Sequence, residues 1–135
     1  MPIKVTAIRR LVRHVCAAEG VTAGEVEVAV VDDEQIAGMA GRFGRPRRAT
    51  DVLSFRMSEP GEPLSVNVAV SAETAVREAG RRGHSIEAEL MLYVAHGLLH
   101  QFEYDDQRPA DAAKMHRRED ALLVALGYGP VYGGS

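Results

Sequence analysis

The chain has 135 residues, of which 46% are hydrophobic and 26% charged, and its formal net charge at pH 7 is -3. This size and composition are those of one ordinary globular domain, so we expect residues 1–135 to fold as a single domain. The negative charge excludes a basic surface all round the molecule, as many nucleic-acid-binding proteins have, but it leaves room for a local basic patch.

The first part of the chain predicts a helix, a strand and a short helix. Thr6 is a candidate cap for a helix that ends before Gly20, because apolar residues recur at helical spacing at Ile8, Leu11, Val12 and Val15. Valines alternate with other residues over 26–30, which is typical of a half-buried strand. Asp32 and Asp33 follow it and predict the start of a short helix.

The second part predicts two strands and three helices. Residues 41–49 hold two glycines, one proline and four arginines, which is typical of an exposed loop, and strands are expected over 51–55 and 66–70. Ser71 and Ser85 are candidate caps of helices over 74–82 and 86–101, and Pro109 suits the first turn of a last helix. The interleaved elements predict an α/β (α+β) fold, with a small mixed sheet of about four strands packed against about five helices.

The cellular location is indicated by what the sequence lacks. Cys16 is the single cysteine, so no disulfide within the chain is expected. No apolar run approaches the roughly 20 residues of a membrane span, and arginines interrupt the N-terminal segment where a secretory signal would be apolar. We therefore expect a cytoplasmic protein that does not associate with membranes.

Two histidines stand out in the otherwise apolar segment 86–101. His96 and His100 are four residues apart, so on a helix they share one face and suit a single metal ion. Asp106 lies far enough beyond His100 for the chain to turn back and supply a third ligand. The alternative is a chance pair on a solvated helix face. Gly97 disfavours a metalloprotease of the HExxH type, because its catalytic glutamate would stand there.

Two motifs in this sequence resemble those of the bacterial YbeY-type endoribonucleases, which are ribosomal-RNA maturation factors. The run HGLLHQFEYDD at 96–106 is similar to the family signature H-G-x-L-H-L-x-G-Y-D-H, and TDVLSF at 50–55 matches a second family block. The resemblance implies a metal-dependent endoribonuclease specific for single strands, which acts in ribosomal RNA processing with ribosomal RNA or a ribosomal subunit as its partner. It further implies that His96, His100 and, with a change of residue type, Asp106 bind one divalent ion and act in catalysis through it. Zinc is the expected ion, and the expected reaction is metal-assisted hydrolysis of a phosphodiester.

The sequence departs from the family pattern at several positions. Asp106 stands where the family has a histidine, and Glu103 where it has a glycine. If Glu103 adopts a left-handed turn, the expected cost is about 1 kcal/mol; otherwise the turn is built differently. Asn67 replaces an aspartate, and Gly44 falls at the position of a family arginine.

Candidate substrate-binding residues surround the TDVLSF block. Arg42, Arg45, Arg47 and Arg48 place four guanidiniums within seven residues, with Arg56 beyond the strand, and this density suits phosphate contacts. The alternative is a solvated basic loop. Ser54 is expected either to donate a hydrogen bond near the metal or to be an ordinary strand residue.

Other polar residues are not expected to belong to the site. We expect His14, His84 and His116 to be surface or structural residues, and Asp111, Glu119 and Asp120 to form a solvated helix face. Two further functions remain open: a metal-containing ribosome-assembly factor without catalysis, and hydrolysis of a different substrate.

Overall fold

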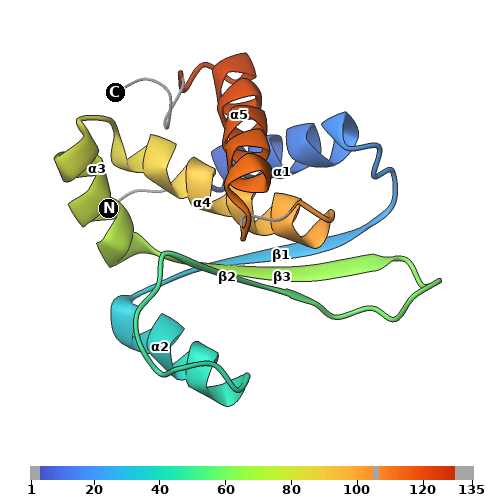
Figure 1. The fold of residues 1–135 in the computed structure, drawn as a ribbon, viewed down its shortest axis with the longest axis horizontal. Coiled ribbons are helices and arrows are strands. Elements are labelled where there is room, and N and C mark those ends of the chain that lie inside the picture. Colours follow the sequence, from blue (N-terminus) through green and yellow to red (C-terminus); the bar gives the residue numbers. More distant parts are fainter. Residues whose placement is uncertain (1–3, 105–106, 130–135) are drawn as a thin grey trace.

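The computed structural model describes residues 4–104 and 107–129. Its elements follow the predicted order, with helices and strands interleaved along the chain (Figure 1). The elements are α1 (Val5–Ala18), β1 (Gly24–Val31), α2 (Asp33–Arg42), β2 (Val52–Arg56), β3 (Leu64–Ser71), α3 (Ala72–Arg82), α4 (Ile86–Gln101) and α5 (Pro109–Ala125).

The strands form one mixed sheet in the order β1-β3-β2. The central strand β3 runs parallel to β1 and antiparallel to β2, so that Val68 lies between Val28 and Ser54. The α/β architecture is confirmed, but the described residues contain three strands where we expected about four. The three segments predicted as strands account for these strands, and the rest of the described chain consists of helices, turns and loops.

Helices cover both faces of the sheet, as Figure 1 shows. On one face α2 packs Ile36 and Ala40 against Leu53 and Ala69. On the other face, side chains of β3 such as Val68 enter the main core, which α1, α3, α4 and α5 complete. Successive side chains of a strand point to opposite faces, so β3 supplies both cores.

Most of the predicted helix ends are confirmed. Asp32 caps α2 in a reciprocal capping box with Gln35, Ser71 and Ser85 cap α3 and α4, and Pro109 stands at the start of α5. The expected cap at Thr6 is wrong. Helix α1 begins two residues earlier, with Lys4 at the N-cap and no capping side chain, so Thr6 lies inside the first turn.

Helix α4 is the centre of the main core. It is in contact with α1, α3, α5, β2 and β3, and its residues from Ala88 to Leu99 are all buried apart from His96. A helix that is apolar on all sides is expected to be enclosed by other elements, as α4 is here. None of the helices in the described residues is both long and apolar enough to cross a membrane.

Candidate metal centre

The two histidines of α4 lie side by side, one turn apart. Their rings are nearly parallel, with centroids 5.8 Å apart and an angle of 16° between the planes. His96 is half-buried and His100 is exposed at the end of the helix. A pair of imidazoles on one helix face, one of them open to solvent, fits two ligands of a divalent ion.

The predicted third ligand, Asp106, lies outside the described residues, as does Asp105. Within residues 4–104 and 107–129 no group of three histidine, cysteine or acidic side chains is placed to hold an ion. The structure thus describes two of the three residues predicted to bind the metal. The binding of a metal by all three remains a prediction.

His96 contacts a buried carboxylate, that of Glu119, which we expected on a solvated helix face. Glu119 of α5 has no exposed surface; its Oε2 lies 3.0 Å from His96 Nδ1 and its Oε1 lies 2.9 Å from His116 Nδ1. The prediction of a solvated Glu119 is therefore wrong. A signal was present, because Glu119 follows Met115 by four residues and precedes Leu122 and Leu123, the buried stripe of α5.

The end of α4 is fastened to strand β2. Ser54 Oγ accepts a hydrogen bond of 3.0 Å from the Gln101 side chain, and the Arg56 guanidinium donates one of 2.8 Å to the Gln101 carbonyl. Ser54 is only 8% exposed. The TDVLSF block therefore meets the histidine-bearing helix directly, and Arg56 is an exposed cation next to the residue that follows His100.

The turn after α4 has the left-handed geometry that we considered for Glu103. The φ angle of Glu103 is +74°, and the Tyr104 amide donates a hydrogen bond of 3.1 Å to the Leu99 carbonyl, which closes the turn. Burial, followed by the neighbouring Glu19, raises the pKa of the Tyr104 phenol. The backbone beyond His100 therefore turns sharply, as a third ligand arriving from later residues requires.

The predicted basic loop lies on the α2 side of the sheet. Arg42, Arg45, Arg47 and Arg48 are all exposed. Arg45 lies over the ring of Phe55, 5.0 Å from its centroid, and Phe55 stacks on Phe43. Because Phe55 packs with the α2 core, these arginines and the histidine pair lie on opposite sides of β2, an edge strand. Arg56 lies on the other side and donates its hydrogen bond to the end of α4.

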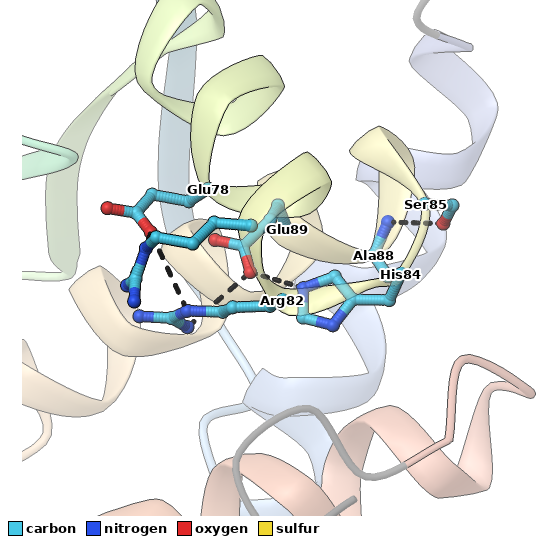
Figure 2. Close-up of polar contacts among 7 residues, drawn as sticks. Glu78, Arg82, His84, Ser85, Ala88 and Glu89 are labelled. Atoms are coloured by element: carbon cyan, nitrogen blue, oxygen red, sulfur yellow. Dashed lines mark hydrogen bonds and ion pairs between the residues drawn. The ribbon is translucent and has the colours of Figure 1, made fainter. Parts of the chain in front are cut away.

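A second buried carboxylate, Glu89, lies near the start of α4. Figure 2 shows it between His84 and Arg82, and both contact its Oε1; Arg82 also pairs with Glu78. Glu89 Oε2 and the Tyr93 hydroxyl have no hydrogen-bond partner among the described residues. Burial, and then the nearby Glu89, raise the pKa of Tyr93. This cluster fixes the α3–α4 turn and is separate from His96.

Comparison with known proteins agrees with the two motifs. The family model described as "Endoribonuclease YbeY" matches residues 2–127. A relative of that name from Anaeromyxobacter sp. (strain Fw109-5) is 42% identical over 113 residues, which are 82% of this chain and 59% of the relative. Another from Moorella thermoacetica is 38% identical over 136 aligned positions, covering 91% of this chain and 86% of the relative. The chain thus spans less than two thirds of the first relative's length and most of the second's.

A solved structure supports the fold. The solution structure of TM1509 from Thermotoga maritima matches with a TM-score of 0.63 at 20% sequence identity, covering 93% of this chain and 87% of that one. The family model and the Moorella relative each extend over most of the sequence, including both motifs. This chain belongs to the YbeY endoribonuclease family.

Proposed function

We propose that this protein is a metal-dependent endoribonuclease that hydrolyses phosphodiester bonds in single-stranded RNA. The observation that carries the proposal is the pair formed by His96 and His100 on α4, in a chain whose relatives are named endoribonucleases. We further propose that it acts in the cytoplasm on ribosomal RNA or a ribosomal subunit. The single cysteine, Cys16, agrees with a reducing compartment.

In this proposal His96, His100 and Asp106 hold one divalent ion, with zinc preferred for its affinity for imidazole and carboxylate ligands. When bound, the ion supplies an activated water and a Lewis acid for the phosphoryl oxygen. The role of the protein itself is to hold the metal ligands and the RNA in position. Gln101 holds the end of α4 against Ser54, so that the histidine pair has a rigid base.

Positive charge for the RNA comes from arginines on both sides of the edge strand β2. Arg56 lies beside the end of α4, and Arg45 lies on Phe55 at the opposite face. Guanidiniums bind phosphate oxygens through several N–H groups at once. A single strand that follows these charges round β2 would bring a phosphodiester to the histidine pair.

The proposal is tested with the purified full chain, a single-stranded RNA oligonucleotide and the His100→Ala variant. His100 is exposed, so its removal leaves the core intact. We expect metal analysis to find about one zinc per chain in the wild type, as one three-ligand site requires. His100→Ala should lose the metal together with at least about 100-fold in cleavage rate, about 2.7 kcal/mol of transition-state stabilisation.

His14→Ala is the matched control, because it removes a histidine of α1 that is not part of the pair. It should keep both metal and activity. Cleavage that survives in His100→Ala would contradict the proposal and point to a contaminating nuclease. RNA binding and metal binding without cleavage in the wild type would instead favour the assembly-factor alternative.

A further inference from the structure

The carboxylate of Glu119 is enclosed and has a histidine on each oxygen. Its side chain has no exposed surface, and it joins His96 of α4 to His116, which lies one turn earlier on α5. Each contact is made through Nδ1, at 3.0 Å and 2.9 Å. These three side chains form a polar link between the two helices, and of the three only Glu119 is fully buried.

The chemistry of the carboxylate decides which nitrogen of His96 carries hydrogen. A carboxylate oxygen is a strong acceptor of hydrogen bonds, so the 3.0 Å contact with Glu119 favours hydrogen on Nδ1 of His96. In a neutral imidazole with hydrogen on Nδ1, the lone pair that binds a metal is on Nε2. The contact thereby sets the direction of the ring and favours the tautomer whose lone pair lies on Nε2.

We propose that Glu119 is a positioning residue for the metal site: it holds His96 with Nε2 as the ligating nitrogen, and His116 holds the carboxylate from the other side. This inference rests on the proposed function, because it assigns a purpose to Glu119 within that site. Glu119 acts through His96 and touches neither RNA nor the reacting atoms.

Stability alone gives a poor reason for a carboxylate at this position. Glu119 lies on the buried stripe of α5 with Met115, Leu122 and Leu123, where a leucine would suit the surroundings. Burying charged groups removes them from water, and replacing a buried ion pair by well-packed apolar side chains is often neutral or stabilising. The need to orient the ring of His96 explains why a glutamate stands here, whereas packing does not.

The chain contains a matched control for this argument. Glu89 is equally enclosed and also contacts a histidine, His84, but it lies seven residues before His96 on α4 and belongs to the cluster in Figure 2. A substitution at Glu89 removes a buried carboxylate without touching the histidine pair. An effect seen at Glu119 but not at Glu89 therefore belongs to the contacts of Glu119 with His96 and His116 and is not general to buried carboxylates.

The experiment measures two properties of the full-length protein and its Glu119→Gln, Glu119→Leu, His116→Ala and Glu89→Gln variants. Long-range 1H–15N NMR spectra of the metal-free protein report the tautomer of His96, and competition with a chromophoric chelator reports the Kd for zinc. Glu119→Leu fills the position with an apolar side chain, and Glu119→Gln keeps the shape of the glutamate side chain. If one of these variants does not fold, the other still tests the inference.

We expect the Nδ1–H tautomer of His96 in the wild type and a raised share of Nε2–H in both Glu119 variants. Their affinity for zinc should fall by about 10- to 100-fold, the usual effect of losing a group that orients a ligand. His116→Ala should show a smaller loss of affinity. Glu89→Gln should lower the thermal midpoint while the tautomer of His96 and the Kd for zinc stay unchanged.

The inference is overturned if the Glu119 variants keep the wild-type tautomer of His96 and their Kd for zinc stays within twofold of the wild-type value. The proposed metal site is not contradicted by that outcome. It is equally overturned if Glu89→Gln weakens zinc binding as much, since the effect would then be general destabilisation. If the wild type binds no zinc, the proposed metal site fails. In that case the His96 tautomer still tests whether Glu119 orients His96. A changed tautomer in both Glu119 variants supports this role of Glu119, and an unchanged tautomer overturns it.

Discussion

Glu103 occupies a position that glycine fills at the other helix ends. After each of the five helices one residue adopts positive φ and the next amide closes the turn, and these residues are Gly20, Gly44, Gly83, Glu103 and Gly127. A side chain with a Cβ is strained there, whereas glycine is not. Within the described residues Glu103 is the single case of positive φ outside glycine. The turn that follows the histidine pair therefore stores backbone strain.

Replacing Glu103 by glycine should raise the free energy of unfolding by about 1 kcal/mol, because the left-handed conformation then costs little. Urea denaturation followed by circular dichroism measures this. Glu103→Ala is the control: it removes the carboxylate but keeps the Cβ, so no comparable gain is expected. A similar gain from alanine would show that the charge of Glu103, and not its backbone, limits stability.

At the scale of elements, the contact of α4 with the sheet depends on Gly97. A Cβ at this position would lie 3.0 Å from Val68 Cγ1, 3.1 Å from Val52 Cγ2 and 3.4 Å from Ser54 Cβ. The glycine next to His96 therefore lets the helix lie directly on β2 and β3. This close approach also brings Gln101 within reach of Ser54 and Arg56.

Gly97→Ala should destabilise the protein by about 1–3 kcal/mol, the usual cost of forcing extra atoms into a packed core. Gly80→Ala on α3 is the matched control, because nothing lies within 4 Å of its added methyl group. There alanine should stabilise by up to about 1 kcal/mol through its higher helix propensity. Thermal or urea unfolding of both variants measures the difference, and equal behaviour would contradict the close packing of α4 on the sheet.

At the scale of the whole molecule, the net charge and the proposed substrate have the same sign. With a formal charge of -3, the protein as a whole repels RNA, so binding depends on where its cations are placed. The arginines of 42–48 gather on the α2 side of the edge strand, and Arg56 lies on the α4 side. Affinity should therefore come from a few local phosphate contacts.

The variant Arg45→Gln/Arg48→Gln should weaken binding to single-stranded RNA and flatten its salt dependence. Each lost phosphate contact is expected to reduce the slope of log K against log salt concentration by about 0.7. The control Arg9→Gln/Arg13→Gln removes the same charge from α1 and should leave the slope unchanged. Fluorescence anisotropy at several salt concentrations measures both, and equal slopes in the two variants would exclude a specific role for the loop.

Much of the fold is local and was predictable. Helix α4 begins and ends where its pattern and the cap at Ser85 indicate, because capping and i, i+4 contacts involve residues close in sequence. The same spacing put His96 and His100 on one face. The fold family followed from the two motifs, while Asp106 as a ligand stays a prediction.

The sequence by itself determined the helices, the strand pattern and the histidine pair, since each depends on neighbours a few residues away. Tertiary structure alone decided the environment of those residues. Glu119 stands 23 positions after His96 and becomes buried only when α5 packs on α4, and Ser54 meets Gln101 only when β2 lies beneath α4. Such contacts depend on how whole elements pack, and periodicity along one helix carries no information about the side chain that another helix brings to it.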